Sequence, residues 1–317
     1  MTSKYQTLKD IQAVKQTFST ELANNLSLIP VPAPLFVTKD SGLNDNLNGV
    51  ERPVKFLTKQ GDDLEVVHSL AKWKRYALGE FEIDPGHGIV TDMRAIRRDE
   101  DLDAIHSYYV DQWDWEKCIL KEQRSLDFLK ENVIKIFNAL KTTEDAMLKK
   151  NPQLTQKLPE DITFVSSQEL EDAYPALSPA EREDVVAKKY GAIFITGIGK
   201  KLNSGKRHDL RAPDYDDWDL NGDLIVYNPV SGHSLELSSM GIRVDKKSLI
   251  KQLAECDCSE RLELPFHKKI INEELPYSIG GGIGQSRVCM FMLEKEHIAE
   301  VHPSVWDSVE ETVSSLI

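Results

Sequence analysis

The chain has 317 residues, which is enough for one large domain or two ordinary ones, and its 40% hydrophobic content can supply a substantial core. Its 39 basic and 52 acidic residues give a formal charge of −13, which argues against a tRNA-sized polyanion as the main partner, although a local basic groove is compatible with that balance. No apolar run approaches the roughly 20 residues that span a bilayer, and the first residues lack a signal-peptide core. We therefore expect a cytoplasmic protein without a membrane segment and without a nucleic-acid partner.

The first predicted element is a long amphipathic helix over residues 5–25. Apolar residues recur there at steps of three and four positions, at Leu8, Ile11, Val14, Phe18 and Leu22. Residues 28–37 follow, and prolines at positions 30, 32 and 34 exclude a helix. We predict an extended edge segment there.

The middle of the chain alternates between strands and helices. A short strand over 64–67 leads into a Lys- and Arg-rich helix that ends near 78, and residues 106–116 read as a strand. A long amphipathic helix is predicted over 122–148. Residues 151–179 contain four prolines and are expected to be a connection, followed by a helix at 180–190 and a strand at 192–195.

The last third contains a hairpin and a glycine-rich strand. Strands at 224–227 and 235–244 flank the turn signal Ser231-Gly232-His233, and a strand and helix fill 278–293. The strands are not separated by regular single helices. This pattern favours an α+β fold with a mostly antiparallel sheet flanked by helices.

The most informative motif is Gly280-Gly281-Gly282-Ile283-Gly284-Gln285-Ser286-Arg287, which runs into an apolar helix. Glycines let a backbone approach a flat ligand closely because no Cβ intervenes. An arginine at the start of a helix suits a phosphate. Alone, this motif is a weak indication of nucleotide binding.

A second motif strengthens that interpretation. The charged run Arg97-Arg98-Asp99-Glu100-Asp101 precedes the strand at 109–116. Together with the glycine-rich motif, it resembles motifs 2 and 3 of the class II aminoacyl-tRNA synthetases of the aspartyl and asparaginyl type. The helix and proline-containing segment over 5–37 resemble motif 1 of those enzymes, which forms their dimer interface. The resemblance implies a homodimer.

Three further stretches are similar to the ammonia-dependent asparagine synthetases, the aspartate–ammonia ligases. These are residues 68–75, 214–218 and 236–243. The likeness extends from about residue 5 to the end of the chain and implies one class II synthetase-like catalytic domain over 1–317. The implied reaction is amidation of L-aspartate by ammonia and ATP through a β-aspartyl adenylate, with release of AMP and diphosphate.

The resemblance also implies roles for nucleotide-binding residues. Arg97 is expected at the α-phosphate of ATP, and Arg287 at the γ-phosphate end with its plane against the adenine. Arginine suits both positions because it is always charged and offers paired donors. Glu100 is expected to accept a hydrogen bond from the adenine amino group or from its own loop. The remaining predicted nucleotide contacts are Arg211, Asp216, Gly282 and Gly284.

Two acids on the predicted hairpin are candidates for binding Mg²⁺. Asp223 and Glu236 occupy its two strands and match the metal-binding positions of the family. Magnesium prefers one or two carboxylates together with phosphate oxygens. The alternative is a pair of solvated strand charges.

The predicted aspartate site combines two cations with a polar lining. Lys74 and Arg243 match the residues that grip a substrate carboxylate, and reaction logic places the α-carboxylate there because the β-carboxylate must react. The ammonium group of aspartate is assigned to Asp45, Gln112 or Asp114. Ser69 and Ser239 are expected to line this pocket.

Ammonium must lose a proton before nitrogen can attack, and a carboxylate near the adenylate can accept it. Asp45, Asp114 and Asp216 are all candidates, and Asp45 is our preferred one. No segment for glutamine hydrolysis is evident, so free ammonia is the expected nitrogen source.

Other functions are less consistent with the sequence. The C-x-C at Cys256 and Cys258 has no second ligand pair nearby and is a poor zinc site. A tRNA-charging synthetase without its anticodon-binding domain is one alternative. A catalytically inactive paralogue is another, although both arginines, both candidate metal acids and the substrate lysine are retained.

Overall fold

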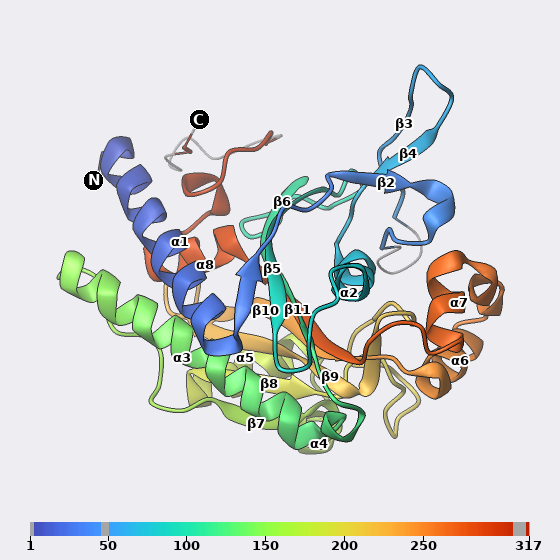
Figure 1. Ribbon diagram of the computed structural model, residues 1–317. Helices are drawn as coiled ribbons and strands as arrows, with labels where there is room; N and C mark the ends of the chain where they lie inside the picture. Colours follow the sequence, from blue (N-terminus) through green and yellow to red (C-terminus); the bar gives the residue numbers. More distant parts are fainter. Residues whose placement is uncertain (1–2, 46–50, 307–314, 317) are drawn as a thin grey trace.

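A computed structural model describes residues 3–45, 51–306 and 315–316 of the chain (Figure 1). Its main feature is an eight-stranded sheet, in which the two edge pairs are parallel and all other neighbours are antiparallel. In spatial order the strands are β1 (Leu28–Pro30), β5 (Gly88–Ile96), β6 (Tyr109–Cys118), β11 (Ser278–Gly284), β10 (His233–Arg243), β9 (Asp216–Asn228), β8 (Ala192–Thr196) and β7 (Thr163–Ser166). The predicted α+β class with a mostly antiparallel sheet is confirmed.

A second, three-stranded sheet projects away from the main body, as Figure 1 shows. It has the order β2 (Phe36–Thr38), β4 (Asp63–Val66) and β3 (Lys55–Leu57). The prolines of the predicted edge segment 28–37 thus separate two short strands that belong to different sheets.

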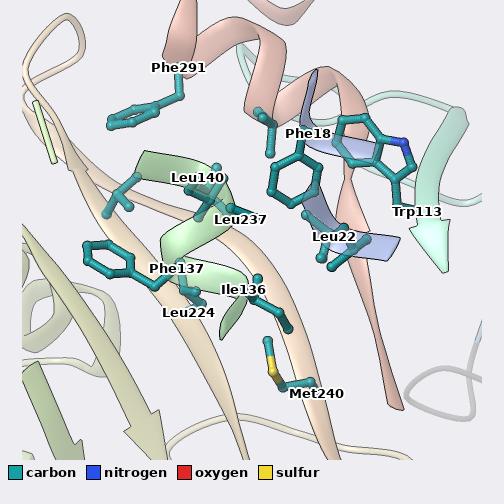
Figure 2. Close-up of a cluster of buried hydrophobic side chains, with 14 of the residues drawn as sticks. Phe18, Leu22, Trp113, Ile136, Phe137, Leu140, Leu224, Leu237, Met240 and Phe291 are labelled. Carbon is teal, nitrogen blue, oxygen red and sulfur yellow. The ribbon is translucent and has the colours of Figure 1, made fainter. Parts of the chain in front are cut away.

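One face of the main sheet is covered by α1 (Lys4–Leu26), α3 (Leu126–Lys150) and α8 (Gln285–Met292). Ser3 caps α1 by accepting a hydrogen bond from the Gln6 backbone N–H, and Ser27 ends it in the left-handed conformation. Figure 2 shows the apolar side chains that fill this interface, with Phe18 and Trp113 in ring contact at 4.6 Å. The labelled members are Phe18, Leu22, Trp113, Ile136, Phe137, Leu140, Leu224, Leu237, Met240 and Phe291.

The opposite face is only partly covered. Helices α4 (Ser167–Ala173) and α5 (Pro179–Tyr190) pack on β8 and β9 through a second apolar cluster. The helices α2 (Ala71–Glu80), α6 (Lys246–Glu255) and α7 (Pro265–Ile271) lie farther along this side. Between them, the faces of β6, β10 and β11 remain open to a cavity. Short 3₁₀ helices complete the described secondary structure at Lys39–Ser41, Lys121–Gln123, Ser259–Glu263 and Ile298–Glu300.

The structure corrects several expectations. The supposed connection at 151–179 contains β7 and α4, and α4 begins with a capping box in which Ser166 and Glu169 bond reciprocally. That Ser-x-x-Glu spacing is a recognisable helix start in the sequence. The strand β5 and the helices α6 and α7 were not predicted, and β9 begins at Asp216, eight residues before the predicted strand at 224. Among the described residues, no helix is both long and apolar enough to cross a membrane.

Candidate active site

A cavity of about 490 Å³ lies on the open faces of β6, β10 and β11 and continues past their ends to the start of α8. The strand alternation of β6 turns Gln112, Asp114 and Glu116 to this side, while Trp113 and Trp115 enter the core on the other. Every predicted site residue except Asp223 lines the cavity: Asp45, Ser69, Lys74, Arg97, Glu100, Gln112, Asp114, Arg211, Asp216, Glu236, Ser239, Arg243, Gly282, Gly284 and Arg287.

An irregularity in β10 brings two of these residues to the same face. The register shifts between Glu236 and Ser238, so one extra residue is inserted opposite β9. Without this bulge, Glu236 and Ser239 would point to opposite sides of the sheet because their numbers differ by three. The bulge therefore lets β10 contribute residues along the length of the cavity.

Lys74 and Asp114 form a buried ion pair at the floor of the cavity. The Lys74 ammonium contacts Asp114 Oδ1 and donates a 3.0 Å hydrogen bond to the Gly281 carbonyl, while Asp114 Oδ2 accepts from the Leu70 backbone N–H at 3.2 Å. Burial lowers the pKa of Lys74, and the charge of Asp114 opposes that shift. Lys74 is thus a buried cation held by one carboxylate.

Arg243 lies between two buried carboxylates. Its Nη2 donates to Glu116 Oε2 at 2.6 Å and its Nη1 donates to Asp216 Oδ1 at 2.6 Å, while Ser278 Oγ donates to Glu116 Oε1 at 2.7 Å. Burial disfavours the charged guanidinium, but the two acids outweigh it and raise the pKa of Arg243. Burial raises the pKa of Asp216 despite the neighbouring arginine. Asp216, expected near the nucleotide, therefore lies directly beside the predicted substrate arginine.

Asp45 is held in place by its neighbours in two turns of the chain. It is 2% exposed, and its Oδ2 accepts a 2.7 Å hydrogen bond from Ser69 Oγ. The Asn44 side-chain oxygen accepts from the backbone N–H groups of Asp45 and His68, at 2.9 and 3.0 Å. These bonds join Asn44 and Asp45 to the turn before α2.

Two arginines line the other end of the cavity. Arg97 is 3.8 Å from Glu100, and its Nε is buried without a hydrogen-bond partner among the described residues. Arg287 lies in the first turn of α8, where its Nη1 donates to the Glu236 carbonyl at 3.1 Å and its Nε donates to the Ile105 carbonyl at 3.4 Å. Two backbone carbonyls thus aim the Arg287 guanidinium, and the Glu236 carboxylate lies 3.8 Å from its Nη1.

The glycine-rich strand is required by the protein's own packing as well as by the cavity. A Cβ at Gly280 would collide with the Glu116 carboxylate, and one at Gly281 would lie 2.6 Å from the Ser239 carbonyl. A Cβ at Gly282 would collide with the Gln112 amide. All three absent side chains therefore make room for residues in or beside the cavity.

Asp223 and Glu236 form the candidate metal centre. Arg211 pairs with Asp223 Oδ2 and also donates to Asp209 Oδ2 at 3.1 Å, and Asp223 Oδ1 is buried without a hydrogen-bond partner among the described residues. Burial raises the pKa of Asp223 to about 7, Arg211 opposes the shift, and the charge of Glu236 adds to it. Glu236 is 42% exposed, whereas Arg211 stands between Asp223 and the cavity.

The sequence reasoning missed several residues of the site. Glu116 holds Arg243 from beside the cavity, and its two-residue steps from Gln112 and Asp114 could have placed it on the same strand face. Asp111, Ser286 and His302 also line the cavity but come from three separate segments, and no local pattern links them.

The model of the aspartate–ammonia ligase family matches residues 5–315. An aspartate–ammonia ligase from Fusobacterium nucleatum is 60% identical over 296 residues, which are 93% of this chain and 90% of that protein. An aspartate–ammonia ligase from Clostridium perfringens is 59% identical over 299 residues, which are 94% of this chain and 89% of that protein. The chain belongs to the aspartate–ammonia ligase family.

Solved structures place this family member in a wider fold group. Asparaginyl-tRNA synthetase from Entamoeba histolytica in complex with asparaginyl-adenylate aligns with a TM-score of 0.69 at 14% identity, over 97% of this chain and 68% of that one. The Pyrococcus horikoshii enzyme, also complexed with asparaginyl-adenylate, gives a TM-score of 0.68 at 15% identity over 94% and 68%. The fold is that of a class II synthetase catalytic domain, as expected.

Proposed function

We propose that this chain makes L-asparagine from L-aspartate, ammonia and ATP through a β-aspartyl adenylate, releasing AMP and diphosphate. The observation that carries the proposal is one cavity with buried Lys74 and Arg243 at its floor and Arg97 and Arg287 at its other end. Two anionic reactants can therefore be held side by side within one polar space. Family membership supports the same reaction.

Aspartate fits the floor with its α-carboxylate toward Lys74 and Arg243 and its β-carboxylate toward Arg97. Both cations are already positioned by protein carboxylates, so little reorganisation accompanies binding. Asp45, Gln112 and Asp114 are the proposed partners of the substrate ammonium group, because all three line this part of the cavity and carry acceptor oxygens. Ser69 and Ser239 complete this part of the lining.

ATP fits the end lined by Arg97 and Arg287. Arg97 Nε is a buried donor without an acceptor among the described residues, and an α-phosphate oxygen would be a suitable acceptor. Arg287 offers a planar guanidinium to the terminal phosphates and the adenine. The remaining nucleotide contacts are proposed for Glu100, Arg211 and the backbone of Gly282 and Gly284, while Asp216 stays paired with Arg243.

The residues fit a bound Mg²⁺. Asp223 Oδ1, which has no hydrogen-bond partner among the described residues, and the exposed carboxylate of Glu236 are oxygen ligands of the required kind, and phosphate oxygens would add the others. When bound, the ion neutralises charge on the departing diphosphate. Arg211 must release or share Asp223 for this arrangement.

Asp45 is the proposed acceptor of the proton that ammonium loses. Its carboxylate is buried at the cavity wall, and its Oδ2 is oriented by Ser69. A fixed carboxylate beside the adenylate can take the proton as nitrogen attacks the activated carbonyl. Asp114 is less suited because its two oxygens already serve Lys74 and the Leu70 backbone.

Product analysis tests the proposed function. We expect AMP and diphosphate to form only when aspartate, ammonium and ATP are all present, and tRNA to have no effect. Release of ADP would indicate a phosphoryl intermediate and contradict the mechanism. Transfer of aspartate or asparagine to tRNA would favour the synthetase alternative, and no turnover under any condition would favour an inactive paralogue.

The metal assignment predicts a specific defect in Glu236→Gln. We expect the Mg²⁺ concentration for half-maximal activity to rise by more than roughly tenfold. Loss of a residue that only supports a metal ligand already costs about that much, and here a proposed ligand itself loses its charge. A magnesium titration at saturating ATP measures this. Glu263→Gln, which changes an 81% exposed carboxylate, serves as the control and should behave like the unaltered protein.

A homodimer is proposed through the segment 28–36. Ile29, Leu35 and Phe36 are 56%, 48% and 45% exposed, although they are large and apolar. A second copy would bury them beside the edge strand β1. Light scattering should give twice the chain mass, and a mass of about 36 kDa at micromolar concentration would contradict the proposal.

A further inference from the structure

A buried hydrogen-bonded chain connects the start of α8 to the segment after Ile298–Glu300. Ser286 Oγ is 2.6 Å from Asp111 Oδ1 and 2.8 Å from His302 Nδ1, and His302 Nε2 is 2.7 Å from the Tyr109 carbonyl. The side chains of all three polar residues are nearly inaccessible, at 2–4% exposed. The His302 ring also stacks on Tyr109 at 4.8 Å.

All of these contacts can be hydrogen bonds at the same time only if the His302 ring carries two protons. A carbonyl can only accept, so Nε2 must donate to Tyr109. The Ser286 hydroxyl has one hydrogen, and an ionised Asp111 can only accept it. When Ser286 gives that hydrogen to Asp111, Nδ1 can bond to the serine oxygen only as a donor. Nδ1 must then carry a proton, and the ring with protons on both nitrogens is an imidazolium ion.

Burial opposes that state, and the charges around the ring act in both directions. Burial lowers the pKa of His302; Asp111 on β6 opposes the shift, and Lys15 on α1 and Arg94 on β5 add to it. Lys15 Nζ and Arg94 Nη1 lie 2.8 and 3.7 Å from Asp111 Oδ2, so two cations already share that carboxylate. While the ring is neutral, His302 Nδ1 and the Asp111 carboxylate both depend on the single hydrogen of the Ser286 hydroxyl.

A polyphosphate would reverse this balance. His302 and Ser286 line the same cavity as Arg287, the residue adjacent to Ser286 on α8. Negative charge in that end of the cavity favours the imidazolium ion over the neutral ring. The completed chain would then fix the first turn of α8 from both sides of Ser286.

We propose that His302 is a proton-linked positioning residue: it takes up one proton from solvent as the triphosphate of ATP enters the cavity, and the resulting chain from His302 through Ser286 to Asp111 fixes Arg287. The proposal rests on the proposed function, because it places the triphosphate near Arg287. It assigns no contact between His302 and the reacting atoms.

Linkage gives the sign of the pH dependence. If binding raises the proton affinity of His302, nucleotide affinity increases as pH falls between the two ionisation points, by up to about tenfold per pH unit. Above that window the ring is neutral with or without nucleotide, and the dependence disappears.

Calorimetry of a non-hydrolysable ATP analogue with Mg²⁺ tests the proposal at pH 7.5 in buffers of different ionisation enthalpy. We expect the unaltered protein to take up more protons than His302→Gln, by a sizeable fraction of one per site. The variant should also lose the pH dependence of KM for ATP while kcat changes little. His233→Gln is the control. It changes an exposed ring at the start of β10 that is paired with Asp184 on α5, and it should match the unaltered protein in both measurements.

Equal proton uptake in His302→Gln and the unaltered protein would overturn the linkage alone. Failure of the analogue to bind the unaltered protein would overturn the proposed function together with it. If His302→Gln does not fold, NMR of the unaltered protein decides: the His302 ring nitrogens should shift toward imidazolium values when the analogue is added. Ring signals that stay neutral at saturation would refute the proposal.

Discussion

Arg287→Ala is expected to reduce kcat/KM by about 10²- to 10³-fold, or roughly 3 kcal/mol of transition-state stabilisation, by analogy with removing one charge-stabilising donor. The reason is geometric. Two backbone carbonyls, those of Glu236 and Ile105, aim the Arg287 guanidinium at the start of α8, and the nearest carboxylate oxygen is 3.8 Å away. Its charge is thus available to phosphate.

The Arg287→Lys variant separates the effect of the positive charge from the effect of the planar guanidinium. A lysine keeps the positive charge but not the planar pair of donors, so an intermediate loss is expected. Steady-state kinetics at varied ATP, with thermal unfolding as a check on folding, measures both variants. Near-normal turnover of a folded Arg287→Ala protein would refute the triphosphate role.

Lys74→Met is expected to weaken aspartate binding severely and also to destabilise the protein by about 3–5 kcal/mol, because Asp114 would remain buried and unpaired. The two effects can be separated. Asp114→Asn removes that charge and keeps an oxygen for the Leu70 backbone N–H. In the double variant, the free energy of unfolding should largely recover.

Aspartate binding should not recover with it. The double variant has no cation at this position, so KM for aspartate should stay raised while KM for ATP changes less. Denaturant unfolding and kinetics at varied aspartate supply the two measurements. A stable double variant with unaltered aspartate affinity would remove Lys74 from the substrate site.

Local patterns account for the elements that the sequence predicted correctly. The hairpin of β9 and β10 has a turn signal, and α1 and α3 have apolar residues at helical spacing. The strand β5 was not predicted because Asp92 and Arg94, which pair with each other on the surface, interrupt its apolar run. The proline content of 151–179 concealed β7 and α4.

Long-range pairing explains what the sequence left out of the site. The predicted lining residues come from motifs that the family resemblance supplied, and the cavity brings all but Asp223 together. Arg243 and Glu116 are 127 positions apart, so nothing local reveals that the arginine is shared by two protein carboxylates. The chain through Asp111, Ser286 and His302 is equally invisible, since each link joins a different segment.

The pairing of β6 with β11 has a consequence for biosynthesis. Gln112 lies opposite Gly284 and Cys118 opposite Ser278, so the floor of the cavity unites segments made early and late in translation. A ribosome must add all the residues between these two strands before the pair can close, and such distant pairings are slow to form. Nascent chains are therefore expected to acquire the aspartate and nucleotide sites together, only after β11 has been released.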